Sequence, residues 1–334
     1  MRKPFFTAIS TFLTIVFIAV VGFSNLAVAS EGEPEKFNAN EVIIEHVLDD
    51  HQWHFADHLV LSLPIIVYSA ERGLEVFSSS HFYDGHNKVE YNGYTLEGRE
   101  IFLGEQKVLD LSITKNVAML FINAAVLLFV LLSVAKAYKN NSGKAPKGLQ
   151  SFIEPIVVFV RDEIVKPNIG HHYQKYLPYI LTLFFFILFG NLLGLLPGAA
   201  NLTGNIAVTL TLAVFTFIIT NVSGNATYWK HIFWTPGVPL PLRLIILPVE
   251  IIGIFTKPFA LTIRLFVAIT AGHIVLLSLI CMTFIFQRYD VGIGASIVVL
   301  FINLIELLVA GIQAYVFALF TSLYIGMATA DDHH

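Results

Sequence analysis

The stretch LIILPVEIIGIFTKPFALTIRLFVAITAGHIVLLSLICMTFIF, residues 244–286, decides the fold class of this chain. As one helix it would extend ~65 Å at about 1.5 Å per residue, roughly twice the thickness of the bilayer hydrocarbon core. Two short spans would need a polar turn between them, and Lys257-Pro258 is a poor candidate because proline in a membrane helix usually kinks it. We therefore expect one long, strongly tilted membrane helix.

The composition of the whole chain also indicates a membrane protein. Of 334 residues, 56% are hydrophobic and only 13% are charged, against about 25% in soluble domains. Between residues 176 and 330 the charged side chains are Lys230, Arg243, Glu250, Lys257, Arg264, Arg288, Asp290 and Glu306. So few charges could not cover a soluble surface, so this part must have lipid as its solvent. The net charge of −4 gives no case for nucleic acid, and the single Cys281 excludes an internal disulfide.

Other apolar runs predict the remaining membrane helices. The run at 291–328 is nearly as long as 244–286 and is expected to form a helical hairpin with it, turning at Gln287–Asp290. Lysines and arginines between the first and second spans mark that loop as cytoplasmic. We predict an all-α polytopic membrane protein of about five membrane helices, with the C-terminus in the cytoplasm. Their predicted ranges are 117–138, 176–197, 205–223, 244–286 and 291–328, with an amphipathic surface helix over 149–166.

The first 110 residues have a different character. Residues 1–29 combine a positive start, a short apolar core and Ala27-Val28-Ala29, which is typical of a cleaved signal peptide; an uncleaved anchor helix is the alternative. Residues 30–110 are polar and mixed, with runs rich in valine, isoleucine and aromatic residues punctuated by Asp84-Gly85 and Asn92-Gly93. This pattern predicts a small β-containing extracytoplasmic segment.

Three histidines in this segment raise the question of a metal site. On a helix, His51, His54 and His58 would align on one face and could bind a metal. No cysteine or carboxylate pattern accompanies them, so a solvated polar turn outside the membrane is the favoured interpretation. We expect no metal and no cofactor.

Charges inside the apolar runs point to function, because each costs at least ~2.5–3.5 kcal/mol at the bilayer centre. Glu250, Lys257 and Arg264 are seven residues apart, so they lie on one helix face. Glu306 and Gln313 share the same spacing on the last run. Asn303 adds to this polar stripe. Two structural alternatives remain. Glu250 and Lys257 could form a pair near the membrane interface that serves helix packing or snorkelling, and Gln313 could only link neighbouring helices by hydrogen bonds.

Arg264 is the central charge of this pattern. A guanidinium stays protonated, so it can attract a carboxylate and block protons but cannot carry them by releasing its own. His273 and Glu306 can exchange protons near neutral pH once burial adjusts their affinities. A fixed positive charge beside titratable groups is what a proton half-channel with a barrier needs.

Three stretches of the sequence are distinctive: KPFALTIRLFVAITAGH at 257–273, ELLVAGIQAYVF at 306–317 and FGNLLGLLP at 189–197. Through them, residues 116–330 resemble subunit a of bacterial F-type ATP synthases. The resemblance implies that Arg264 is the essential arginine that faces a ring of c subunits and separates two proton half-channels. Glu250, His273, Glu306 and Gln313 match positions that line the path or support the arginine, with Lys257 and Asn303 as supporting residues.

The resemblance further implies partners and a location. The partners would be c-ring subunits, b-type peripheral stalk subunits, protons and lipid, in the inner (plasma) membrane, with the N-terminus extracytoplasmic. The presence of both His273 and Glu306 favours protons over sodium. One departure is Ala268, where many relatives carry asparagine, with Val267 before it where a small residue is usual.

Two other functions were weighed. A self-contained secondary transporter or channel would usually show inverted repeats, and none is seen between the halves of the sequence. An intramembrane enzyme would need a nucleophile or a metal motif such as H-E-x-x-H, and none is present. The chain also has no P-loop, so we expect no active site of its own and assign nucleotide chemistry to partners.

Overall fold

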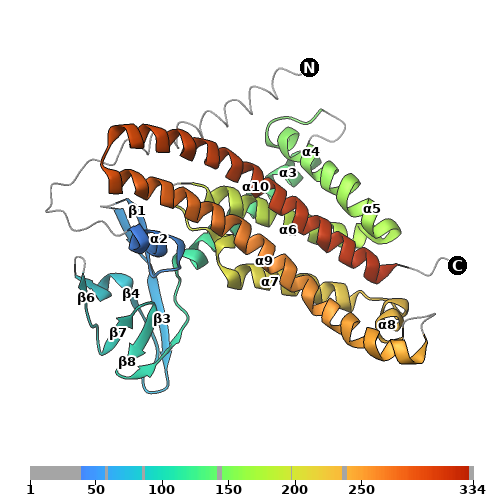
Figure 1. Cartoon of the computed structure of the whole chain (residues 1–334), viewed down its shortest axis with the longest axis horizontal. Helices are drawn as coiled ribbons and strands as arrows, with labels where there is room; N and C mark the ends of the chain where they lie inside the picture. The colour runs from blue at the N-terminus through green and yellow to red at the C-terminus, as the bar shows by residue number, and fades with distance from the viewer. Residues whose placement is uncertain are drawn as a thin grey trace.

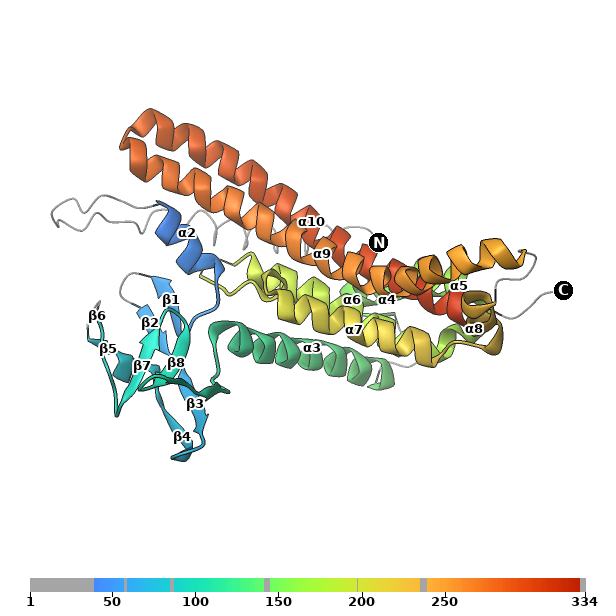
Figure 2. The same cartoon turned by 60° about the horizontal axis from the view of Figure 1, so that its bottom comes forward.

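The structure is a computed structural model that describes residues 39–56, 59–84, 87–140, 145–196, 198–234 and 239–330. The predicted signal peptide at 1–29 and His58 lie outside these residues. The described chain has two parts: a β-containing N-terminal segment and a helical bundle, with the segment at one end of the bundle (Figures 1 and 2).

The bundle confirms the predicted fold class. Among the described residues, four helical stretches are long and apolar enough to cross a membrane, or five if a bent pair counts as one span. The bent pair is α7 and α8, which meet at 102°. The helices are α3 (Lys115–Asn140), α6 (Tyr173–Gly194), α7 (Ile206–Val222), α8 (Ala226–Phe233), α9 (Leu240–Phe286) and α10 (Tyr289–Thr329).

The predicted long hairpin is confirmed by α9 and α10. Pro248 and Pro258 lie inside α9, and the helix continues through both. The chain reverses after Phe286 through Gln287, whose φ of 47° lies in the left-handed region. The two helices then lie side by side along the bundle (Figures 1 and 2). Because α9 is unbroken, its charged residues Glu250, Lys257 and Arg264, which are seven residues apart, lie on one face of the helix.

A broken helix precedes α6 and packs closely on α10. It runs through α4 (Leu149–Phe159), the π-helical turn η2 (Val160–Val165) and α5 (Lys166–Ile169), and the short η3 (Gly170–His172) leads into α6. The π turn leaves the carbonyl of Ile164 open to side chains. It accepts hydrogen bonds from Asn168 Nδ2 at 2.7 Å and Ser322 Oγ at 3.1 Å. These contacts fix the end of α10 against α5.

The bundle core forms where small residues of α10 meet α6. Ala314 and Ala318 of α10 are fully buried in one cluster with Ile180, Phe185 and Ile187 of α6. Small side chains let two helices approach closely, which is how membrane helices associate without a hydrophobic driving force between them. This packing fixes the position of Glu306, two turns earlier on α10.

The described residues of the N-terminal segment form one short α-helix, one 3-10 turn and four small antiparallel sheets with the strand orders β1-β2, β10-β3-β4, β5-β6 and β7-β8-β9. Its core joins the sheets through Ile65, Val67, Phe82, Tyr94 and Ile101. The elements are α2 (Ala39–Val47), β1 (Gln52–Ala56), β2 (Leu59–Ser62), β3 (Pro64–Ser69), β4 (Gly73–Ser78), η1 (Ser79–Phe82), β5 (Tyr83–Asp84), β6 (Asn87–Lys88), β7 (Tyr94–Glu97), β8 (Glu100–Leu103), β9 (Gln106–Lys107) and β10 (Leu109–Asp110).

Asn92-Gly93 forms the tight turn that its sequence indicates. Both residues have positive φ, 53° and 81°, and Tyr91 and Tyr94 on either side exchange two backbone hydrogen bonds. This is the backbone that asparagine and glycine adopt at least cost. The apolar run over 89–96 is therefore interrupted by the turn, and the strand begins only at Tyr94.

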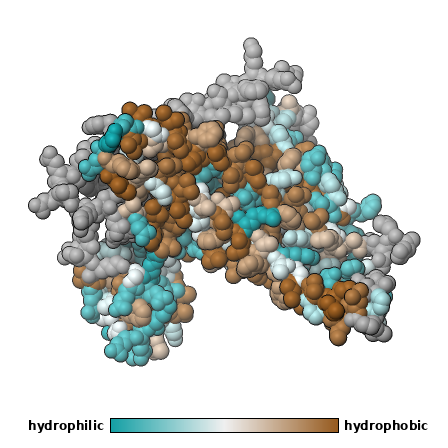
Figure 3. Space-filling view, viewed as in Figure 1, coloured by the Kyte–Doolittle hydropathy of each residue, from teal (hydrophilic) through white to brown (hydrophobic). Residues whose placement is uncertain are grey.

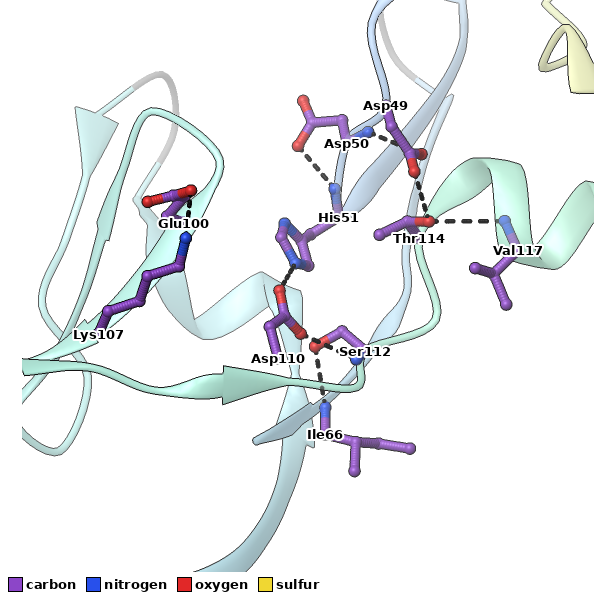
Figure 4. Close-up of polar contacts among 10 residues, drawn as sticks. All are labelled: Asp49, Asp50, His51, Ile66, Glu100, Lys107, Asp110, Ser112, Thr114 and Val117. Atoms are coloured by element: carbon purple, nitrogen blue, oxygen red, sulfur yellow. Dashed lines mark hydrogen bonds and ion pairs between the residues drawn. The ribbon is translucent and has the colours of Figure 1, made fainter. Parts of the chain in front are cut away.

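Neither interpretation of the histidines holds for those described. His54 lies in strand β1 and His51 directly precedes it, so they do not align along a helix. His51 is not solvated, because only 2% of it is exposed and its Nε2 donates a hydrogen bond to Asp110 Oδ2 at 2.9 Å (Figure 4). Within the described parts of the chain, no three metal-ligating side chains gather.

The segment is tied to the bundle by hydrogen bonds and packing. Asp49 accepts a hydrogen bond from Thr114 Oγ1 at 2.8 Å (Figure 4). It also accepts one from the backbone N–H of Asn116 at 3.1 Å, which joins it to the start of α3. Trp53 donates from Nε1 to the carbonyl of Gly198 at 2.7 Å, in the loop between α6 and α7. Helix α2 packs on α9. The segment therefore lies at the end of the bundle where α9 turns into α10 (Figure 2).

Candidate functional site

A cavity lined in part by polar side chains, which we call the outer cavity, lies near the end of the bundle that carries the β-containing segment. It has a volume of about 250 Å³ and is lined by residues of α6, the α6–α7 loop, α9 and α10. Its polar side chains are Asn191, Asn201, His273 and Glu306. The structure thus brings His273 and Glu306, which come from different helices, into one wall of one cavity.

Glu306 is held against the backbone of α9. Only 9% of the residue is exposed, and a Cβ built on Gly272 would lie 2.6 Å from Glu306 Oε1. No side chain larger than hydrogen fits at position 272 with the carboxylate where it is. Glycine beside His273 therefore sets the distance between the carboxylate and α9.

An asparagine of α6 organises the wall opposite. Asn191 Nδ2 donates to the carbonyl of Ala310 on α10 at 3.3 Å, and its Oδ1 accepts from Thr203 Oγ1 at 2.7 Å. Thr203 belongs to η4 (Leu202–Gly204), which Asn201 caps through the N–H of Gly204 at 3.2 Å. The network joins three elements around the cavity. We did not predict Asn191 as a site residue, although an asparagine inside an apolar run was the available signal.

A second, narrower cavity lies toward the opposite end of the bundle, and we call it the inner cavity. Its volume is about 10 Å³, which is about the space of one water molecule. Thr216, Thr220 and Asn221 of α7 line one side, and Lys257 of α9 and Tyr324 of α10 line the other. The threonines were also missed, and their four-residue spacing along an apolar helix was the signal that could have found them.

Arg264 lies between the two cavities along α9. It follows Lys257 by seven residues and precedes His273 by nine, which places it ~10 Å and ~13 Å from them along the helix axis. Its guanidinium carbon is 4.4 Å from the ring centroid of Phe320 on α10, and its residue is exposed on the hairpin surface. Within the described chain, no carboxylate forms an ion pair with Arg264.

Lys257 of α9 contacts an aromatic ring on the same face of α10 as Phe320. Lys257 Nζ is 5.3 Å from the ring centroid of Tyr324, and the rings of Phe320 and Tyr324 are 6.0 Å apart. Cations over aromatic rings gain about 0.5–2 kcal/mol, depending on desolvation. Two cations of α9 are thus steadied by neighbouring rings of α10 without being neutralised.

Three of the predicted residues do not belong to the lining of either cavity. Glu250 is half-buried and interacts electrostatically with Lys257 and with Tyr228 of α8. Gln313 and Asn303 are half-buried on α10 and line neither cavity. Ala268 lines the outer cavity, and its side chain adds no polar group to that wall.

Fold and site together define a multi-pass membrane protein with two cavities, each lined in part by polar side chains, on either side of an arginine in a long apolar helix. The sequence profile described as the ATP synthase A chain matches residues 117–326, and one described as a domain of unknown function (DUF8433) matches residues 42–119. The chain belongs to the ATP synthase A chain family.

Individual relatives agree with the profile. The chain is 40% identical over 308 residues to ATP synthase subunit a of Chloroherpeton thalassium, covering 90% of this chain and 79% of the relative. It is 52% identical over 234 residues to ATP synthase subunit a 2 of Chlorobaculum tepidum, covering 67% and 66%. Nothing in these matches supports the alternative of a self-contained transporter or channel.

Proposed function

We propose that this chain, a proton-translocating stator subunit by its family, works by letting Arg264 separate two half-channels. The outer cavity with His273 and Glu306 forms one half-channel, and the inner cavity with Lys257 belongs to the other. Protons pass between them only on a carboxylate of a moving partner, because Arg264 keeps its own proton. Glu250, Gln313 and Asn303 support the path.

The position of Arg264 carries this proposal. It is exposed on the hairpin surface between two cavities that polar side chains line in part, and within the described chain it has no carboxylate partner. An unneutralised cation in an apolar surface is costly, so it is expected to meet an anionic partner from outside the chain. A ring of c subunits, each with a membrane carboxylate, is the partner that fits, and b-type peripheral stalk subunits would hold the chain still.

The proposed location is the inner (plasma) membrane, with the β-containing segment outside the cytoplasm and the C-terminus inside. Basic residues between α3 and α6 support this orientation, since cytoplasmic loops carry an excess of lysine and arginine. A signal peptide over residues 1–29 and an extracytoplasmic segment over 30–110 belong to the same proposal.

The test is Arg264→Ala in inverted membrane vesicles that contain the whole ATP synthase. We expect ATP-driven acidification, followed by a pH-sensitive dye, to be lost while ATP hydrolysis is retained. Val267→Ala, an exposed position on the same helix, is the matched control and should pump normally. Normal acidification by Arg264→Ala, or purification of an active complex without any c subunit, would overturn the proposal.

A further inference from the structure

One sheet of the N-terminal segment exposes an apolar face. In the β10-β3-β4 sheet, Ile65 and Val67 are fully buried in the core of the segment. The opposite face carries no charge, and it consists of Ile66, Tyr68, Leu74, Val76, Leu109 and Leu111. Strand pairing places these six together, because Ile66 pairs with Val76, Tyr68 with both Leu74 and Leu109, and Leu111 bonds to Ile66. We call this set the apolar sheet face.

Most of the apolar sheet face is uncovered by the described chain. Leu74 is 62% exposed and Val76 is 63% exposed, and Tyr68, Leu109 and Leu111 are also exposed. An antiparallel sheet with one solvated face normally alternates apolar and polar residues. A contiguous apolar face of this kind marks an interaction surface.

The connection to α3 places this sheet near the start of an apolar helix that is long enough to cross a membrane. Four residues separate β10 from the start of α3 at Lys115, so Leu111 lies at most ~14 Å from the helix start. The connection is held, because Asp110 is bonded to His51 and Thr114 to Asp49 (Figure 4). The strands β3 and β4 run across the direction of the helices beside the start of α3 (Figure 2). A sheet in that position lies along a bilayer surface.

The chemistry of the face fits lipid. Exposed apolar side chains continue on α3 itself, where Phe121 and Phe129 face outward. Tyrosine is enriched at membrane interfaces, where its hydroxyl meets the headgroups, and Tyr68 is the one polar-tipped residue of the face. The space-filling view shows that the front of the segment is largely hydrophilic, so the segment as a whole is not apolar (Figure 3).

We propose that the apolar sheet face rests in the lipid leaflet on the side of the membrane where α3 begins, so that the N-terminal segment is a membrane-surface anchor. This inference depends on the membrane fold and not on the role of Arg264 or on which side is extracytoplasmic. It gives a role to a segment whose matching family has no assigned function.

Site-directed spin labels in the whole complex, reconstituted in phosphatidylcholine–phosphatidylglycerol vesicles, test the proposal. With Cys281→Ala as background, single variants Leu74→Cys and Val76→Cys carry the label. Glu97→Cys, an exposed position of the same segment outside the face, is the water control, and Phe129→Cys on α3 is the lipid control. ATP-driven pumping by each labelled complex verifies assembly.

We expect the labels at Leu74 and Val76 to match Phe129, with high collision rates with oxygen and several-fold lower collision rates with a water-soluble nickel chelate than at Glu97. Nickel accessibility equal to that of Glu97 would show a solvated face and overturn the proposal. Low accessibility to both reagents would show that protein covers the face, which also overturns it.

Discussion

In the N-terminal segment, the buried His51 donates to the carboxylate of Asp110, whereas in the hairpin Arg264 lies over the ring of Phe320. The first hydrogen bond joins a buried imidazole to a partly exposed carboxylate, and removing Asp110 would leave the buried Nε2 of His51 without its partner, at a cost of about 1–3 kcal/mol. The arginine is steadied by an aromatic ring that leaves its charge unneutralised. The hydrogen-bonded pair His51–Asp110 stabilises the N-terminal segment. Arg264, which has no carboxylate partner within the described chain, leaves the hairpin able to bind an anionic group of another subunit.

Glu306 follows the hairpin pattern. It is nearly buried, and within the described chain no ion pair joins it to a cation. A carboxylate without a fixed partner can exchange its proton, whereas the carboxylate of Asp110 is held by a hydrogen bond from His51. The comparison therefore predicts that hairpin variants alter proton movement and that segment variants alter stability.

The largest effect is expected from Glu306→Gln, which keeps the size of the side chain and removes its titration. Loss of a positioned acid or base typically costs 10²–10⁴-fold, so ATP-driven pumping should fall by about 100-fold or more while ATP hydrolysis remains. Pumping is measured in inverted vesicles against Ile297→Val, an exposed position of the same helix. Unchanged pumping would remove Glu306 from the proton path.

Gly272→Ala should displace Glu306 without removing it. The new Cβ would lie 2.6 Å from Oε1, and the flexible end of the side chain can move away, so the helix should remain folded. A misplaced reacting group can cost up to about 100-fold, and we expect pumping to fall by about tenfold. Gly294→Ala on α10, where nothing lies within 4 Å, is the matched control. Equal pumping by the two variants would contradict the close contact.

Local patterns in the sequence predicted the hairpin and the Asn92-Gly93 turn. The hairpin follows from length and hydropathy, since residues 244–286 exceed any single perpendicular span. The turn follows from the backbone preferences of two residues. Both features depend on neighbours along the chain, so no knowledge of packing was needed.

Contacts between distant residues could not be predicted in the same way. His51 and Asp110 are 59 residues apart, and nothing in the spacing of three histidines indicates a distant carboxylate. The cavities likewise depend on which helices pack together. Spacing put His273 and Glu306 on particular faces of their helices, but only the packing of α6 on α10 brings Asn191 to the same cavity.

Asp110→Asn should weaken the N-terminal segment, because it removes the charged partner of a buried histidine. We expect a loss of about 1–3 kcal/mol in local stability. Hydrogen exchange of the β3 amides in the purified complex measures it, and pumping should be retained. If Asp110→Asn abolished pumping and left hydrogen exchange of β3 unchanged, a segment variant would alter proton movement and not stability, which would contradict the comparison.

The same pair gives a pH dependence with a defined sign. Burial raises the pKa of Asp110, but hydrogen bonds from His51 and Ser112 outweigh it and hold the pKa below its ordinary value of 3.8. A lowered pKa in the folded state means that the stabilisation is complete above the unfolded pKa and is lost as pH falls through the folded pKa. Protection of β3, corrected for intrinsic exchange rates, should be constant from about pH 7 to 5 and decline below about pH 4. Asp110→Asn should lack this acid decline.

The smallest effect is expected from Glu100→Ala, which removes the partner of Lys107 in the same segment. The two side chains are 53% and 59% exposed, so water screens their attraction. Exposed ion pairs contribute only about 0–1 kcal/mol, and hydrogen exchange of β8 should change little. If Glu100→Ala lowered the stability of the segment as much as Asp110→Asn does, an exposed ion pair would contribute as much stability as a pair with a buried histidine. A clear difference between the two variants would show that pairing matters here because Asp110 meets a histidine removed from water.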